Sequence, residues 1–97
     1  MFTFTGIIIK EELGYSSLCP ELDVASDGDS PESAKAMLLE AATLHLQGAF
    51  EDGLPYLRSI PLSDDPRQTT PDTVVEAFRF TVDIYVHANA KAPFTQT

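Results

Sequence analysis

The chain has 97 residues with 15 acidic and 6 basic side chains, so its formal net charge is −9. Direct binding of nucleic acid is not expected, because phosphate neutralisation needs clustered lysines and arginines. The acid surplus is compatible with a basic protein partner, although it also serves solubility. The length suits one domain with a modest core.

Cysteine content and hydropathy bear on where the protein resides. Cys19 is the single cysteine, so an intramolecular disulfide is excluded and a structural zinc site would need distant histidines. The N-terminus lacks the basic segment of a signal peptide, and no apolar run has membrane-spanning length. A cytoplasmic protein without membrane contact is therefore predicted.

Three strands are expected before a helix. Residues 2–10 alternate and then become continuously apolar and β-branched, which is typical of a central strand covered on both sides. Residues 15–19 return as the second strand of a hairpin, and Pro20 ends it because proline cannot donate a ladder hydrogen bond. Residues 22–26 form a brief third strand, in which Val24 points inward.

A long capped helix follows. Ser30 can accept a hydrogen bond from the free amides of the first turn, and Pro31 suits the first helical position. Gly48 or Gly53 can supply the left-handed residue that ends the helix. The core-facing sector is expected to contain Ala34, Met37, Leu38, Ala41, Ala42, Leu44, His45 and Ala49. Leu39 and Leu46 fall at its edges or beyond and are interpreted as singly exposed leucines, with contact to a flanking loop or a second subunit as the alternative.

The last part of the chain gives a proline-rich loop over residues 55–71 and then a clear strand. One parity of this strand should face the core, and the other should face water. The core parity is Val74, Phe78, Phe80, Val82, Ile84 and Val86, and the wet parity is Arg79, Thr81, Asp83, Tyr85 and His87.

These elements predict an α+β fold, a β-β-β-α-β two-layer sandwich with one long helix on one face of the sheet. The four-stranded sheet is expected to be mixed, with strand order 3-2-1-4, because a right-handed crossover through the helix would place the last strand beside the first and parallel to it. Residues 1–88 form the predicted domain, and residues 89–97 a flexible C-terminal tail.

Four motifs follow one another in a characteristic order. They are Gly14-Tyr15, the run from Leu18 to Ser26 with Cys19-Pro20-Glu21-Leu22-Asp23, the Gly28-Asp29-Ser30 cap, and the helix pattern Glu32, Ala34, Leu38, Glu40-Ala41 and Leu44. In these motifs the chain resembles the HicB-like antitoxin family. The resemblance implies a truncated ribonuclease-H-like (RNase H-like) fold that binds and blocks a small basic HicA-like toxin, which cleaves RNA. Many members continue into a DNA-binding module, whereas this chain stops soon after the last strand, so no direct DNA binding is expected.

Catalysis and cofactors are not expected. A nuclease of the full ribonuclease H type needs converging carboxylates around divalent metals, and the candidates are Glu11, Glu40 and Asp83. Glu40 and Asp83 should point away from each other, so no metal site is predicted. Cys19 could pair with His45 or His87, but no third group orients such a base. Cys19 is interpreted as a small buried residue and His45 as a core-facing one.

The wet parity of the last strand is the predicted partner-binding surface, with Arg79, Thr81, Asp83 and Tyr85 as its residues. An ordinary solvated face and burial in a homo-oligomer, a dimer or a tetramer, are the alternatives. The predicted function is neutralisation of a basic toxin by occlusion, without enzyme activity. The alternatives are an orphan HicB-like oligomeric protein that has no toxin, and a degenerate metal-dependent nuclease.

Overall fold

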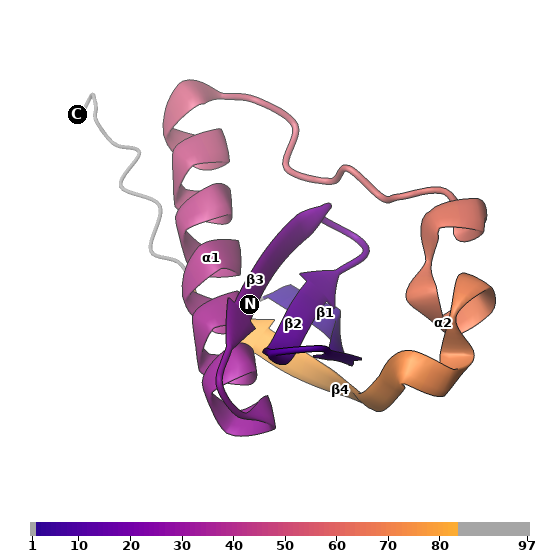
Figure 1. The fold of residues 1–97 in the computed structure, drawn as a ribbon. Helices are drawn as coiled ribbons and strands as arrows, with labels where there is room; N and C mark the ends of the chain where they lie inside the picture. The colour runs from indigo at the N-terminus through magenta and orange to yellow at the C-terminus, as the bar shows by residue number, and fades with distance from the viewer. Residues whose placement is uncertain (1, 84–97) are drawn as a thin grey trace.

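The computed structural model describes residues 2–83, in which one long helix lies beside a four-stranded sheet (Figure 1). The strands and helices are β1 (Phe2–Glu11), β2 (Gly14–Cys19), β3 (Val24–Gly28), α1 (Pro31–Asp52), α2 (Pro66–Thr69) and β4 (Val74–Val82). Two 3₁₀ turns, Leu62–Asp64 and Pro71–Thr73, flank α2. The predicted order of three strands, a long helix and a last strand is confirmed.

β1 is the central strand that the sequence predicted. The sheet order is β3-β2-β1-β4, as expected. Consecutive residues of a strand point to opposite faces, so burial of both Ile7 and Ile8 shows that the two faces of β1 are covered at this point. β2 ends at Cys19 before Pro20, and Val24 of β3 packs against the core as predicted.

The prediction of a mixed sheet with β4 parallel to β1 is wrong, because β4 pairs with β1 in the antiparallel direction. α1 finishes near the start of β1, where the Phe50 and Phe2 ring centroids are 5.5 Å apart. A parallel β4 would begin there. The segment from residue 53 to residue 73 instead carries the chain back along the sheet, so that Val74 lies opposite Ile9 and Val82 opposite Phe2.

The ends of α1 follow from local chemistry. The Ser30 hydroxyl accepts a hydrogen bond from the Ser33 amide at 3.1 Å, and the Ser33 hydroxyl lies 3.1 Å from the Ser30 amide, so both orphan amides are satisfied. The helix continues through Gly48 and ends at Gly53, which has a left-handed φ of 66°. The amides of Gly53 and Leu54 donate back to the carbonyls of Phe50 and Ala49.

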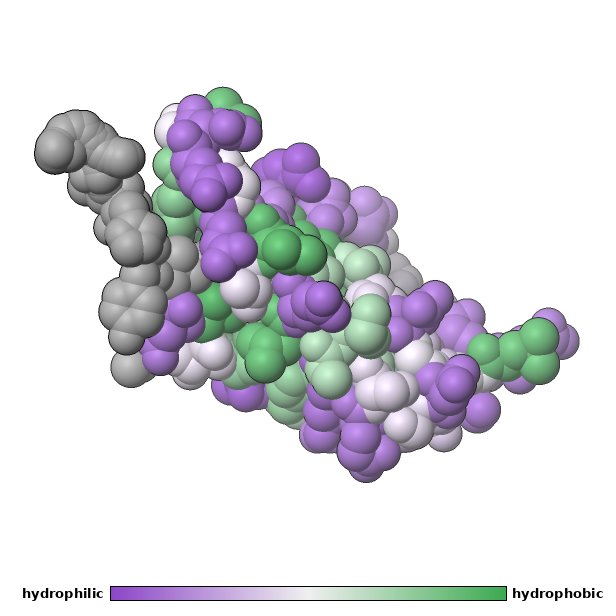
Figure 2. All heavy atoms as spheres, turned by 90° about the vertical axis from the view of Figure 1, so that its left-hand side faces the viewer, coloured by the Kyte–Doolittle hydropathy of each residue, from purple (hydrophilic) through white to green (hydrophobic). Residues whose placement is uncertain are grey.

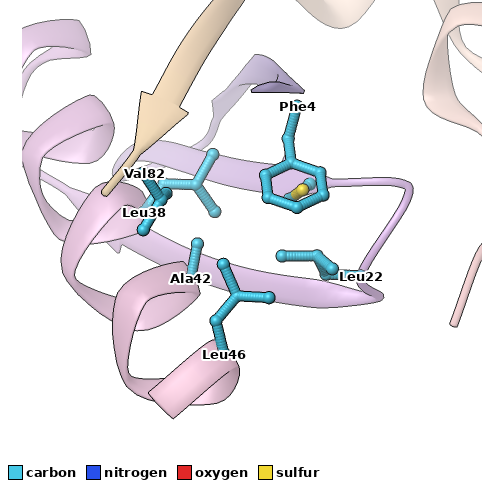
Figure 3. Close-up of a cluster of buried hydrophobic side chains, with 7 residues drawn as sticks. Phe4, Leu22, Leu38, Ala42, Leu46 and Val82 are labelled. Atoms are coloured by element: carbon cyan, nitrogen blue, oxygen red, sulfur yellow. The ribbon is translucent and has the colours of Figure 1, made fainter. Parts of the chain in front are cut away.

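The core lies between α1 and the sheet. Figure 3 shows side chains from β1, β4, α1 and the β2–β3 connection converging on one volume. The buried cluster consists of Phe4, Cys19, Leu22, Leu38, Ala42, Leu46 and Val82. Six partly buried residues surround it, namely Phe2, Val24, Phe50, Tyr56, Phe78 and Phe80. Burial of large aromatic surfaces contributes much of the stability of so small a domain.

The predicted core face of α1 is partly wrong. Leu46 is fully buried, whereas Met37 is 44% and Leu44 is 61% exposed; Leu39 is exposed as expected. The helix packs mainly on β3 and β2, and Lys35 reaches Glu76 of β4 with a 2.6 Å ion pair. On the same flank the Lys35 ammonium lies over the Phe78 ring, 5.2 Å from its centroid. The opposite flank carries the exposed side chains of Met37 and Leu44.

The proline-rich segment contains more secondary structure than the predicted loop. It crosses to the side of the sheet opposite α1, where α2 lies (Figure 1). The Arg58 and Ile60 amides donate to the carbonyls of Glu21 and Pro20, each at 3.0 Å. The buried Asp65 carboxylate accepts hydrogen bonds from the Arg67 amide and guanidinium, which caps α2 and lowers the pKa of Asp65.

No helix within residues 2–83 is long and apolar enough to cross a membrane. The predicted tail, residues 89–97, and the core-parity residues Ile84 and Val86 lie outside the described part of the chain.

Candidate functional site

The predicted partner-binding residues begin on β4. Arg79 and Thr81 are exposed on the sheet face opposite α1, while Phe78, Phe80 and Val82 turn toward the core, so the predicted parity of this strand is confirmed. Asp83 follows the strand and is exposed. Tyr85, the fourth predicted residue, and His87 lie outside the described residues.

Neighbouring residues extend this surface into an open, flat area. We call Val75, Ala77, Arg79 and Thr81, all exposed, the outer β4 face. Thr3 and Thr5 of β1 lie opposite Thr81 and Arg79 and add hydroxyl groups to it. Among the described strands β4 pairs with β1 alone, so its other edge offers free backbone donors and acceptors.

A second exposed surface lies on α1, and the sequence assigned three of its four residues, Met37, Ala41 and Leu44, to the core. Met37, Ala41, Leu44 and Gly48 recur at spacings of three and four residues and therefore share one flank of the helix, which we call the α1 stripe. Its two large side chains are exposed. The apolar pattern could not reveal this surface, because periodicity shows that an arc of a helix is apolar but not how much of that arc the sheet covers.

A shallow hollow continues the α1 stripe at the C-terminal end of α1. Its volume is about 320 Å³, and its lining comes from the last turns of α1 and from the chain that follows: Leu44, His45, Gly48, Ala49, Asp52, Leu54, Pro55 and Arg58. His45 Nε2 lies 2.9 Å from the Tyr56 carbonyl oxygen. A carbonyl can only accept, so the His45 Nε2–H donates this bond and fastens the returning chain to α1.

Carboxylates accompany this surface. Glu40 and Glu51 lie on α1 beside Leu44 in the helical projection, Asp52 lines the hollow, and all three are exposed. Arg58 is the basic side chain among the lining residues. Figure 2 views the α1 side of the molecule and shows hydrophobic areas set between hydrophilic ones. The arrangement combines apolar contact area with negative charge.

The carboxylates considered for nuclease chemistry are spread over the molecule. Glu11 ends β1 and accepts a hydrogen bond from the Ser16 hydroxyl at 2.8 Å. Asp83 follows Val82, which pairs with the first residue of β1, so Glu11 and Asp83 occupy opposite ends of the sheet. Glu40 is exposed on α1. Within residues 2–83 no three His, Cys, Asp or Glu side chains are grouped to hold a metal ion.

Cys19 is buried, as the sequence predicted, and its surroundings suppress the thiolate. Burial is the main cause that raises the pKa of Cys19 to about 12, and the adjacent Glu21 carboxylate, 3.6 Å from Sγ, adds to the rise. His45 bonds Tyr56 instead of the thiol. A nucleophilic cysteine needs a lowered pKa, so this environment is of the structural type.

Comparison of the chain with protein-family models, with curated proteins and with solved structures finds no match.

Proposed function

We propose that this chain is a protein-binding module of the HicB-like antitoxin type, which neutralises a small basic RNA-cleaving toxin by covering its active surface. The observation that carries the proposal is the combination of exposed apolar side chains and exposed carboxylates on the α1 side of an acidic domain. The motif resemblance from Gly14 to Leu44 supports it, and so does the strand order β3-β2-β1-β4 with one long helix.

Electrostatics favours a basic partner. The net charge of −9 attracts a positively charged protein over roughly a Debye length, about 8–10 Å at physiological salt, and raises the encounter rate. A toxin that cleaves RNA must present basic groups to phosphates. Carboxylates that pair with those groups compete directly with RNA, while apolar contacts hold the complex together. Inhibition then needs neither a cofactor nor catalytic chemistry in this chain.

Self-association is the second candidate, and the outer β4 face favours it. Arg79 lies on this face and Asp83 lies just beyond it, so two copies of the chain could pair these opposite charges with each other. Val75 is 55% exposed and offers apolar contact beside the free strand edge. This arrangement gives Arg79, Thr81 and Asp83 a role in a homo-oligomer, as an orphan HicB-like protein would need.

The test is reconstitution with the product of the neighbouring reading frame. We expect that frame to encode a small basic protein that cleaves RNA, and we expect equimolar addition of this chain to stop cleavage. Arg79→Glu should change the sedimentation coefficient of the chain alone if the outer β4 face joins two copies. Absence of a basic neighbour, or unchanged RNA cleavage at a tenfold excess of this chain, would contradict the antitoxin proposal.

A further inference from the structure

We propose that the α1 stripe, together with Leu54 and the adjoining hollow, is the surface that binds the basic partner, and that the partner contributes a basic amphipathic helix. This inference rests on the proposed function and names the site at which it operates. It differs from the sequence-based prediction, which placed partner binding on β4.

Exposed apolar groups give the first argument. Leu44, Leu54 and Met37 are 61%, 58% and 44% exposed. Ala41 lies between Met37 and Leu44 along the helix, and Gly48 lies beyond Leu44. Because these two residues are small, a second backbone can approach α1 closely there. From Met37 to Gly48 the stripe extends about 16 Å at 1.5 Å per residue, which matches three turns of a partner helix laid along it.

The shape of the surface is fixed before binding. The amide of Leu54 donates to the Ala49 carbonyl at 2.8 Å, directly after the left-handed Gly53, so Leu54 is held beside the last turn of α1. The bond from His45 to the Tyr56 carbonyl holds the chain that follows. A preformed hollow loses little conformational entropy on binding, and an apolar side chain of the partner can enter it.

The negative charge around the α1 stripe favours a basic partner over a second copy of this chain. Glu40, Glu51 and Asp52 are exposed along or beside the stripe. Two copies of this chain joined through their α1 stripes would bring six such carboxylates together, and like charges that face each other at an interface oppose association. A helix with leucines on one face and lysines or arginines beside them meets both the apolar and the charged requirements.

The probe is a synthetic amphipathic peptide of about 18 residues with leucines at helical spacing and lysines on the flanking positions. Two matched peptides accompany it, one with the leucines replaced by alanine and one with the lysines replaced by glutamate. Binding to the full chain is measured by fluorescence anisotropy, and the site is mapped by amide chemical-shift changes on the ¹⁵N-labelled protein. We expect changes at Leu44, Gly48 and Leu54 and none at Ala77 or Arg79.

Four variants separate specific docking from general attraction to an acidic protein. Leu44→Asp and the double variant Glu40→Lys/Glu51→Lys should each weaken binding of the basic leucine peptide about tenfold or more, as for central interface residues. The controls are Leu13→Asp, at a hairpin residue that is 95% exposed, and Glu12→Lys/Asp72→Lys, which makes the same change of net charge at two exposed carboxylates outside α1. Both controls should leave the affinity within about twofold.

Each of the following outcomes would overturn the inference. The first is equal binding of the leucine and alanine peptides, which means charge attraction alone. The second is a shift map centred on β4. The third is loss of self-association of the chain alone on Leu44→Asp, which would make the stripe an interface between copies. If the toxin is inhibited equally by the parent chain and by Leu44→Asp, the antitoxin function stands and this site is wrong. If no basic neighbour exists while the peptide binds as described, the antitoxin function is wrong and this binding site stands.

Discussion

The carboxylate of Glu21 accepts hydrogen bonds from Thr5 of β1, at a position beyond the end of the pairing between β1 and β2. Pairing between β1 and β2 ends at Ile7 and Leu18, so the Thr5 amide has no partner on that side of the strand. Both Glu21 oxygens accept from this amide, at 3.0 and 3.2 Å, and Oε2 also accepts from the Thr5 hydroxyl at 2.7 Å. The Glu21 carboxylate thus takes the place of a neighbouring strand beside Thr5.

Replacement of Glu21 by glutamine tests this relationship through pH. Burial alone would raise the pKa of Glu21, but the hydrogen bonds from the Thr5 hydroxyl and amide outweigh it and hold the pKa below its ordinary value. The folded state therefore favours the ionised carboxylate, and this stabilisation is present above the unfolded pKa of about 4.3 and is lost as the pH falls through the folded pKa. Glu21 is partly solvated, so we expect Glu21→Gln to cost about 1 kcal/mol at neutral pH.

The measurement is urea unfolding of both proteins from neutral pH to about pH 3. The stability difference between parent and Glu21→Gln should shrink as the pH falls. The pKa of Asp65 is also lowered, and its loss affects both proteins equally, so the difference isolates Glu21. A difference that stays constant over the whole range would contradict the assigned role.

The orientation of α1 is tested by two leucines that are two residues apart. Leu46→Ala should lower the free energy of unfolding by about 2–5 kcal/mol, because it removes a fully buried side chain and leaves a cavity. Leu44→Ala should change it by less than about 0.5 kcal/mol, because Leu44 is largely exposed. Chemical denaturation measures both. The reverse ranking would restore the helix face that periodicity indicated.

The sequence predicted those features of the fold that depend on neighbouring residues, but not the rotation of α1 that buries Leu46 and exposes Leu44. The start of α1 at Ser30 and the inward parity of β4 depend on neighbouring residues, and both were predicted correctly. The rotation of α1 depends on which flank packs on the sheet, and no local pattern carries that information. The direction of β4 likewise depends on the path that the chain takes between α1 and β4, and the sequence of a proline-rich loop does not predict that path.

The same distinction applies to the candidate surfaces. Alternation along β4 correctly placed Arg79 and Thr81 on the exposed face, because the period of a strand assigns each side chain to one side. The α1 stripe could not be found in this way. Met37 and Leu44 look like core residues in the sequence, and they are exposed on the flank of α1 that faces away from Lys35.

Gly28 lies where the end of β3 approaches the first turn of α1. A Cβ atom added at Gly28 would lie 2.5 Å from the Ala34 amide nitrogen, a backbone atom that cannot turn aside. We expect Gly28→Ala to cost about 1–3 kcal/mol through displacement of the helix start.

Gly48→Ala is the matched control, because a Cβ atom added there meets no atom of the described chain within 4 Å beyond its own helical turns. This change inside α1 should stabilise the protein by about 0.5–1 kcal/mol. Thermal unfolding followed by circular dichroism compares both variants, and equal effects would show that β3 and α1 are farther apart.

Cys19 provides a chemical measure of how often the core opens. With its pKa raised to about 12 by burial, the native thiol is almost entirely protonated in mildly alkaline buffer, and solvent does not reach it. Alkylation by iodoacetamide requires the thiolate, so we expect modification only through opening of the core, at a rate that rises with urea and that Leu46→Ala increases. Leu44→Ala should leave the rate unchanged, because that side chain lies outside the core. Mass spectrometry follows the reaction, with the urea-unfolded chain as the reference for a free thiol. A native chain that reacts as fast as this reference would mean that Cys19 is accessible and that the sheet end beside Glu21 is open.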